Sequence, residues 1–185
     1  HTDQSFVTKP AKATILHALE TPPVGGDTMY SNMYLAYDSL STGLKKLLTN
    51  IRVENTGNRN RRRGGQDKRD RYKGHSHVKP VNPPPEIDTR SHHPIIRTHP
   101  ETGRKGLYIS SHTEGFADFD FEESLPIIEF LLEHIRRPEF TARLRWQPGT
   151  VAVWDNRCVM HYAVNDYQGQ RRCMRRITIK GDKPR

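Results

Sequence analysis

The chain has 185 residues, so a single domain over 1–185 is expected and two domains would be cramped. Hydrophobic residues make up only 33%, and the formal net charge is +9. No apolar run approaches the roughly 18 residues that cross a bilayer, which argues against a membrane protein. Cys158 and Cys173 form no CxxC pair. We therefore expect neither a zinc knuckle nor a disulfide framework. Free cysteines suit a reducing compartment, so we expect a cytoplasmic location.

The first elements are a strand and two short helices. Residues 12–20, KATILHALE, alternate between apolar and polar and end at a turn, TPPVGG, as a strand does. Asp27 is the expected N-cap of a helix, because five apolar residues then recur at helical spacing: Met29, Met33, Ala36, Tyr37 and Leu40. Ser41 is expected to begin a second helix, TGLKKLLTNI.

Periodicity disappears over about 52–92. Residues 51–74 hold nine Lys or Arg against three acids, and VNPPPEIDT follows. This composition is typical of an exposed loop, and we predict a basic insert at 52–92 near the mouth of a site. The histidines of HSH and SHHP, which lack cysteine or carboxylate partners at ligand spacing, are expected to be solvated loop residues: His75, His77, His92 and His93.

Regular patterns resume after the insert. HPIIRTHPETGRKGLYIS predicts two short strands joined by a glycine-containing turn, and Ser124 is expected to begin a helix that stops by Pro138. Its buried stripe is Leu125, Ile128, Leu131, Leu132 and Ile135. Three more strands are expected in FTARLRW, TVAVWDN and RRCMRRITIKGD. Many short strands with few helices predict a mainly β fold, a sandwich or jelly roll with flanking helices.

Three residues could bind one metal ion. If His1 and Asp3 lie on a strand, the two-residue repeat directs both side chains to one face, where a divalent ion could accept an imidazole nitrogen and a carboxylate oxygen. HxD alone is a weak signal. His161, after a strand and a polar turn, is the candidate third ligand. Two histidines and one carboxylate are the ligand set of non-haem Fe(II) oxygenases.

Two arginines lie close to this candidate site in the sequence. Arg172 and Arg176 are four residues apart on the last predicted strand, so they share a face, opposite Cys173, Ile177 and Ile179. Guanidinium groups directed inward require anions, and the planar fork of arginine suits a carboxylate or a sulfonate. A solvated strand face is the competing interpretation.

Three blocks resemble the taurine dioxygenase/TfdA family of Fe(II)- and 2-oxoglutarate-dependent dioxygenases. They are GGDTMYSNMYLAYDSLS, THPETGRKGLYIS and RLRWQPGTVAVWDNRCVMHYAVNDYQGQRRCMRRITIKGDKP, in the family's order. The resemblance implies a double-stranded β-helix, or jelly roll, incomplete at the N-terminus. It also implies that His1 and Asp3 are the first two iron ligands and that His161 is the last.

The resemblance assigns the co-substrate and substrate contacts as well. Thr28, in GGDT, matches the threonine whose hydroxyl contacts 2-oxoglutarate. Arg172 matches the arginine that clamps the distal carboxylate of 2-oxoglutarate. Arg176 matches the arginine that holds the anionic group of the substrate in taurine-oxidising members, whereas other members use that pocket differently.

The implied activity is hydroxylation of a small anionic substrate of the sulfonate, sulfate ester or aryloxyacid type. Fe(II), 2-oxoglutarate and dioxygen take part, and succinate and carbon dioxide are released. The partners are then small molecules rather than a membrane, and a homo-oligomer stays open. Family members carry a segment before HxD, so we expect the chain to be the C-terminal part of a longer enzyme, cut at the metal site.

Two other functions compete. A true N-terminal His1 could bind copper through its amine and imidazole, as in secreted monooxygenases, but this histidine brace leaves the GGDT and QRRCMRR blocks without a role. Alternatively, the basic residues of 59–73 could bind nucleic acid, and binding would then weaken steeply with salt. Tyr72 is the one aromatic residue within that run, so a solvated loop is favoured.

Overall fold

The computed structural model describes residues 1–57, 62 and 89–185. Its elements follow the chain as β1 (Ala13–Glu20), β2 (Thr28–Asn32), α1 (Met33–Asp38), α2 (Thr42–Leu48), β3 (Arg52–Thr56), β4 (Arg90–Pro94), β5 (Ile96–Thr98), β6 (Lys105–Leu107), β7 (Thr113–Phe116), α4 (Phe121–His134), the short 3₁₀ helix η2 (Pro138–Phe140), β8 (Thr141–Leu144), β9 (Val151–Asp155), β10 (Val159–Ala163) and β11 (Cys173–Ile179). Strands outnumber helices, which confirms the predicted mainly β fold.

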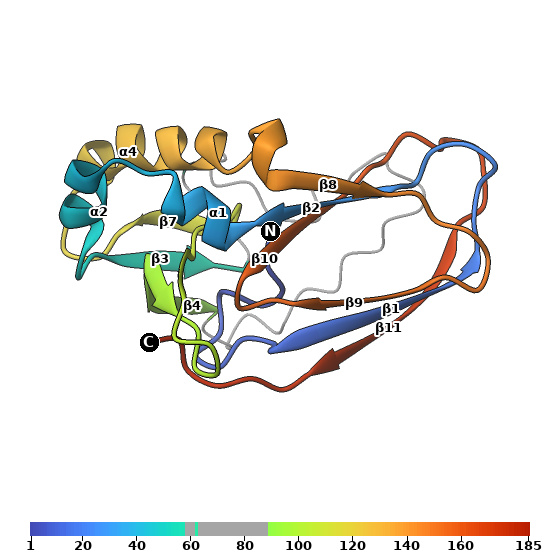
Figure 1. The fold of residues 1–185 in the computed structure, drawn as a ribbon, viewed down its shortest axis with the longest axis horizontal. Helices are drawn as coiled ribbons and strands as arrows, with labels where there is room; N and C mark the ends of the chain where they lie inside the picture. The colour runs from blue at the N-terminus through green and yellow to red at the C-terminus, as the bar shows by residue number, and fades with distance from the viewer. Residues whose placement is uncertain (58–61, 63–88) are drawn as a thin grey trace.

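Two three-stranded sheets form a sandwich in one half of the molecule. One has the order β11-β1-β9 and the other β10-β2-β8, and all four pairings are antiparallel. Figure 1 shows the two sheets as separate layers, with β9 leading back into β10 in the opposite layer. Non-consecutive neighbours and strands that change sheet are expected of a jelly roll.

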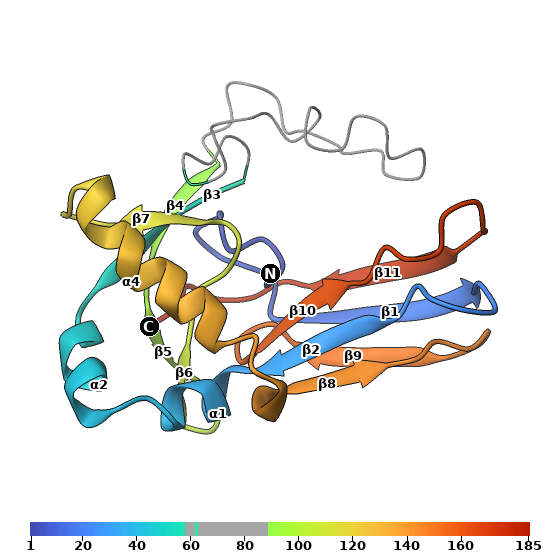
Figure 2. The ribbon, with the colours of Figure 1, turned by 90° about the horizontal axis from the view of Figure 1, so that it is seen from above.

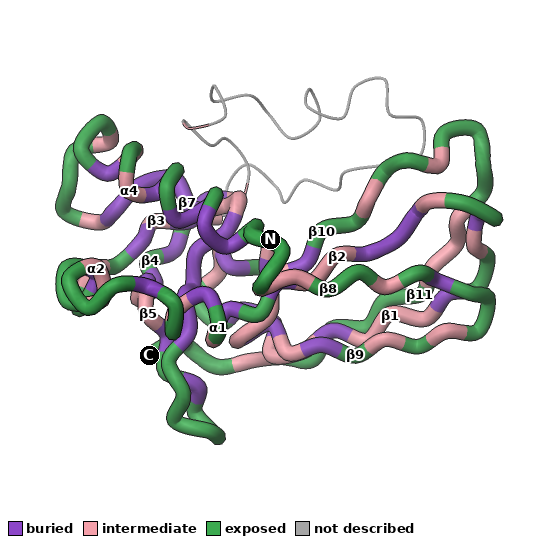
Figure 3. Tube along the Cα trace, turned by 45° about the horizontal axis from the view of Figure 1, so that its top comes forward, coloured by how far each residue is buried: buried purple, intermediate pink, exposed green. Residues whose placement is uncertain are grey.

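The other half combines smaller sheets with helices. Its sheet has the order β4-β3-β7, and β5 and β6 form the predicted hairpin. In Figure 2, α1, α2 and α4 all lie over this half and leave most of the sandwich uncovered. Buried residues gather along α4, β3 and β4 in Figure 3. The hydrophobic core is here: Met33, Ala36, Leu40, Leu48, Val53, Ile95, Leu107, Ile109, Phe116, Ile128, Leu131, Leu132 and Ile135.

The first helix begins later than predicted. Residues 28–32 form the central strand β2, because pairing with both β10 and β8 satisfies their backbone groups on two sides. The N-cap is Asn32, whose side chain accepts hydrogen bonds from the backbone of Tyr34 and Leu35. Asp27 instead accepts a hydrogen bond from Arg143 Nε at 2.7 Å. The second helix does begin after Ser41, as predicted.

The predicted insert is too long at both ends. Residues 52–56 and 90–94 are the paired strands β3 and β4, and Val53 is fully buried. His93, expected to be solvated, is 1% exposed, because it lies on β4 beneath the N-terminal segment and hydrogen-bonds Val7 O. His92 is exposed as expected. His75 and His77 lie outside the described residues.

Helix α4 begins three residues before Ser124. Asp120 is the N-cap, and its backbone N–H donates to the Glu123 carboxylate at 3.0 Å, which is one half of a capping box. Within the helix, Ser124 is fully buried and its hydroxyl donates to backbone carbonyls of the first turn. The helix ends before Pro138, as predicted. Among the described residues, no helix is long and apolar enough to span a membrane, and both cysteines are free.

Candidate metal centre

Backbone pairing brings together His1 and His161, which are 160 residues apart in the sequence. The His1 nitrogen donates to His161 O at 2.8 Å, and the His161 N–H donates back to His1 O at 2.8 Å. This reciprocal pair is the antiparallel pattern, so His1 lies beside β10 on the side opposite β2. The sequence argument for a shared face was conditional on a strand at His1 and Asp3, and in the structure a turn begins at Asp3.

Three ligand-type side chains converge at this point. One ligand atom from each of His1, Asp3 and His161 lies within 4.8 Å of the others. Asp3 Oδ1 is 3.5 Å from His1 Nε2 and 3.8 Å from His161 Nε2. Asp3 is 5% and His161 9% exposed, whereas His1 is half-buried. Two imidazole nitrogens and one carboxylate oxygen, gathered at the edge of the sandwich, fit a divalent transition metal.

The surroundings of Asp3 and His161 favour the protonation states in which these side chains bind metals. Burial would raise the pKa of Asp3, but hydrogen bonds from His1 and Thr14 outweigh it and hold that pKa well below its usual range. Burial lowers the pKa of His161 to about 3, and the neighbouring His1 acts in the same direction. An ionised carboxylate and a neutral imidazole are the forms that bind metals.

Arg176 lies on the metal side of β11. Its Nη1 is 3.5 Å from Asp3 Oδ1, and 59% of its side chain is exposed. Ile177 and Ile179 are on the outside of the sandwich, 56% and 43% exposed. Arg176 and the two isoleucines are thus on opposite faces, as predicted, but the outer face also carries Arg175 and Arg172 lies just before the strand.

Arg172 precedes β11 and turns back into the molecule. Its Nε donates to Gly26 O at 3.0 Å, and its Nη2 is buried with no hydrogen-bond partner among the described residues. Gly26 has φ +71°, and a Cβ there would lie 3.0 Å from Arg172 Cδ. A side chain at this position would crowd Arg172 and would also be strained by the positive φ, so the loop favours glycine here. A partly buried guanidinium with one buried, unsatisfied N–H group can bind an anion.

Thr28 lies on β2, 2% exposed, and its hydroxyl oxygen accepts the Trp146 indole N–H at 2.9 Å. Its own hydroxyl proton can therefore be donated elsewhere. Tyr30, which sequence reasoning missed, is two residues further along β2 and pairs with His161 across the sheet. Its hydroxyl is buried without a partner in the described structure. Burial raises the pKa of Tyr30 to about 12, against the effect of the Arg172 charge.

A second cluster of ligand types is already satisfied by hydrogen bonds. His99 Nε2 lies 3.1 Å from Asp155 Oδ2, and His99 Nδ1 accepts two backbone N–H groups at 3.2 Å. The ring proton must then be on Nε2, so neither nitrogen has a lone pair for a metal. Asp155 is also bound by Arg157, and burial raises the pKa of the nearby Cys158 thiol. This cluster is structural.

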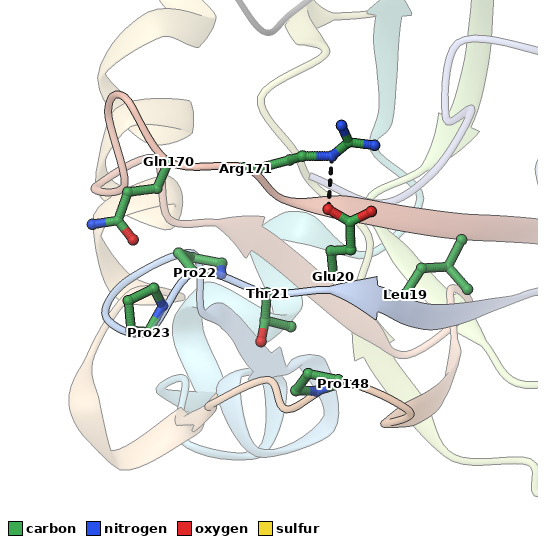
Figure 4. Close-up of a pocket in the computed structure, with 8 residues that line it drawn as sticks. All are labelled: Leu19, Glu20, Thr21, Pro22, Pro23, Pro148, Gln170 and Arg171. Atoms are coloured by element: carbon green, nitrogen blue, oxygen red, sulfur yellow. Dashed lines mark ion pairs between the residues drawn. The ribbon is translucent and has the colours of Figure 1, made fainter.

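A surface cleft lies among the loops at one end of the sandwich. Figure 4 shows its lining residues: Leu19, Glu20, Thr21, Pro22, Pro23, Pro148, Gln170 and Arg171. Arg171 points to Glu20, with 2.7 Å between Nε and Oε2. The cleft includes none of the predicted site residues, and its one ion pair is largely exposed.

The competing functions receive little support. The His1 nitrogen, which a copper brace would use as a ligand, donates to the His161 carbonyl. Most of 59–73 lies outside the described residues. Its one described residue, Arg62, is turned toward the protein, where Nη1 contacts Glu129 at 3.0 Å and Nε donates to Thr113 O at 3.1 Å.

Known proteins are similar to this chain in sequence and in fold. The family model "Taurine catabolism dioxygenase TauD, TfdA family" matches residues 1–178. An alkylsulfatase of Acinetobacter baylyi is 36% identical over 98% of this chain and 56% of its own length. The 2,4-dichlorophenoxyacetate dioxygenase of Cupriavidus pinatubonensis, which is alpha-ketoglutarate-dependent, is 34% identical over 98% of this chain and 60% of its own length.

A solved structure gives the same result in three dimensions. The complex of AAD-2 with Mn(II) and N-oxalylglycine superposes with a TM-score of 0.82 at 30% identity, covering all of this chain and 69% of the other. The chain thus spans little more than half the length of the two relatives above. Because the family match runs through the strands that bring His1, Asp3 and His161 together, the chain belongs to the TauD/TfdA family of dioxygenases.

Proposed function

We propose that this chain binds Fe(II) through His1, Asp3 and His161 and uses 2-oxoglutarate and dioxygen to hydroxylate a small anionic substrate. The observation that carries the proposal is the convergence of three ligand atoms within 4.8 Å, from residues at opposite ends of the chain. The relative that is named as an alpha-ketoglutarate-dependent dioxygenase and the complex of AAD-2 with Mn(II) and N-oxalylglycine support the same chemistry.

Arg172, Thr28 and Tyr30 are proposed to hold 2-oxoglutarate. Arg172 offers an unsatisfied, buried Nη2, and Thr28 and Tyr30 offer hydroxyl protons from the same face of β2. A carboxylate placed there would receive charge-assisted hydrogen bonds in a site shielded from water, where they are strongest. Arg172 already donates Nε to Gly26 O, so its guanidinium is fixed in place before the ligand binds.

The protein's own contribution is binding and orientation. When bound, iron and 2-oxoglutarate supply the oxidising chemistry with dioxygen, releasing succinate and carbon dioxide. His1 and His161 provide imidazole nitrogens, and Asp3 provides a carboxylate in a buried position. The partly exposed side of the cluster, at His1 and Arg176, is where a substrate can enter.

Arg176 is proposed to bind the substrate anion. Its guanidinium is 3.5 Å from Asp3 and more than half exposed, so it can reach a sulfate, sulfonate or carboxylate beside the metal. The names of the relatives include an alkylsulfatase and an aryloxyacetate dioxygenase, whose substrates share a terminal anion. Hydroxylation of a carbon that bears a sulfonate, sulfate ester or aryloxy group would release that group as sulfite, sulfate or a phenol and leave a carbonyl group on the carbon.

Succinate formation tests the reaction. The chain is supplied with Fe(II), 2-oxoglutarate and air, and with an alkyl sulfate, an alkylsulfonate, taurine or a phenoxyacetate in turn. We expect succinate in excess of the substrate-free rate with at least one of them. A rate that none of the four raises would overturn the proposed substrate class.

Metal binding tests the centre separately. Calorimetric titration with Mn(II) is expected to show one site in the wild type and none in His161→Ala, with the same far-UV circular dichroism. His92→Ala, at an exposed histidine on β4, is the matched control and should bind as the wild type does. Equal binding by both variants would contradict the metal centre.

A further inference from the structure

We propose that Asn156 and Thr14 form a hydrogen-bond relay that fixes which carboxylate oxygen of Asp3 faces the metal. The relay runs from Asn156 Nδ2 to Thr14 Oγ1 at 2.8 Å, and from Thr14 Oγ1 to Asp3 Oδ2 at 2.6 Å. Asn156 and Thr14 are positioning residues, because they act through Asp3. The inference rests on the proposed metal centre.

Trp154 sets the direction of the relay. Its indole N–H, which can only donate, lies 3.0 Å from the Asn156 side-chain oxygen. Rotating the amide by 180° would set its NH₂ group against that N–H, two donors facing each other. The amide oxygen must therefore face Trp154, and the NH₂ group must face Thr14.

The Thr14 hydroxyl then has one possible role. It accepts from the Asn156 NH₂ group, which has no lone pair to offer, so its single proton is directed to Asp3 Oδ2. The backbone holds this geometry, since Thr14 on β1 pairs directly with Trp154 on β9. Oδ1 of Asp3 is left toward His1 and His161.

Asn156 and Trp154 also contact the segment around Asp3 and the ring of His161. The backbone carbonyl of Asn156 accepts a hydrogen bond from the Thr2 hydroxyl at 2.7 Å, and the side-chain oxygen of Asn156 lies 3.4 Å from the Asp3 backbone nitrogen. The Trp154 ring packs on the His161 ring with 4.8 Å between centroids. One buried network thus reaches the segment that carries two ligands and also the side chain of the third.

Burial makes the relay hard to replace. Thr14 is 0% and Asn156 1% exposed, so water has no access to take over a lost hydrogen bond. Groups that orient a metal ligand typically change metal affinity by about 10- to 100-fold when they are removed. We expect a loss of that size without any change in the three ligands.

Mn(II) affinity, measured by calorimetry on the whole chain, tests the relay. Thr14→Val removes the hydroxyl and keeps the shape, and is expected to weaken Mn(II) binding about 10- to 100-fold. Thr14→Ser restores the hydroxyl and should return affinity to within about threefold of the wild type. The Co(II) absorption spectrum should change in Thr14→Val and recover in Thr14→Ser.

Ser31→Ala is the matched control. Ser31 is also a buried hydroxyl on a sandwich strand, but it donates to Ile135 O at 2.7 Å and contacts none of the proposed ligands. It should lose stability and keep Mn(II) affinity. Unchanged affinity in Thr14→Val, or an equal loss in Ser31→Ala, would overturn the relay.

Asn156→Asp covers the case in which Thr14→Val does not fold. It keeps the size of the side chain and an acceptor for Trp154, but it turns the NH₂ donor into an acceptor. The Thr14 hydroxyl would then be drawn away from Asp3, and a similar loss of affinity is expected; wild-type affinity would overturn the relay. If the wild type itself binds no Mn(II), the proposed metal centre fails first, which the His161→Ala comparison shows independently.

Discussion

The sandwich half and the helix-covered half of the molecule differ in the kinds of side chain that they bury. The hydrophobic cluster draws on α1, α2, α4 and the strands beneath them, and β1, β9 and β11 contribute no residue to it. The sandwich instead buries polar side chains, such as Thr14, Asn156 and Asp3, and exposes apolar ones, such as Val153. Stability should thus depend mainly on one half and ligand binding on the other.

The sharpest test of the binding half compares two adjacent arginines. Arg172→Ala removes a partly buried guanidinium that is proposed to clamp 2-oxoglutarate, and should weaken its binding by about 2–5 kcal/mol, or about 30- to 4000-fold. Arg171→Ala removes an exposed arginine paired with Glu20, and should change binding little. Titration of 2-oxoglutarate into the Mn(II)-loaded chain measures both; equal effects would contradict the assignment.

Two adjacent leucines on α2 test the helical half. Leu48 is fully buried in the core, whereas Leu47 is 55% exposed. Leu48→Ala should lower the free energy of unfolding by about 2–5 kcal/mol, and Leu47→Ala by about 0.5 kcal/mol or less. Urea denaturation gives both values. Mn(II) affinity of the folded protein should be the same in each, and a loss confined to Leu48→Ala would show that the two halves are coupled.

His93 should make the helical half sensitive to acid. Burial lowers its pKa from 6.5 to about 4, so the unfolded chain binds a proton in this range and the folded chain does not. The stabilisation is present above pH 6.5 and is lost as the pH falls to 4, by about 3 kcal/mol.

His93→Gln should flatten that pH dependence, because glutamine does not titrate and can still donate to Val7 O. His92→Gln, at the exposed neighbour on the same strand, should keep the wild-type slope. Thermal unfolding of the metal-free chain at several pH values is the measurement. A slope that is unchanged in His93→Gln would mean that another group titrates.

The sequence predicted best where one pattern dominates. Local patterns correctly predict the strands β1 and β11, the helix cap at Ser41 and the apolar stripe of α4. Two elements were missed. The sequence pattern places RVENT of β3 in the insert because this stretch holds a single aliphatic residue, whereas in the structure a hydrogen bond from Thr113 to its Asn55 helps to stabilise the strand. SHHP of β4 was assigned to the same loop.

The candidate site depended on long-range information. Nothing in local spacing joins His1 to His161, because backbone pairing between residues 160 positions apart brings them together. The residue types and the strand-turn context suggested His161 as a ligand, and the family resemblance supplied the pairing with His1 and Asp3. Tyr30 was missed because residues 28–32 were interpreted as helical. As a strand, the two-residue repeat would have placed Tyr30 on the same face as Thr28.

The boundary between β2 and α1 gives the smallest expected effect. Asn32 caps the helix with hydrogen bonds to Tyr34 and Leu35 N–H groups at 3.0 and 3.2 Å, so Asn32→Ala should cost about 1 kcal/mol of stability. Asn32→Asp should keep most of it, because a carboxylate caps equally well. Since the cap faces solvent rather than the metal, Mn(II) affinity should not change in either variant. A loss of affinity would show that the strand carrying Thr28 and Tyr30 is held in register by this cap, and that the two halves meet at β2.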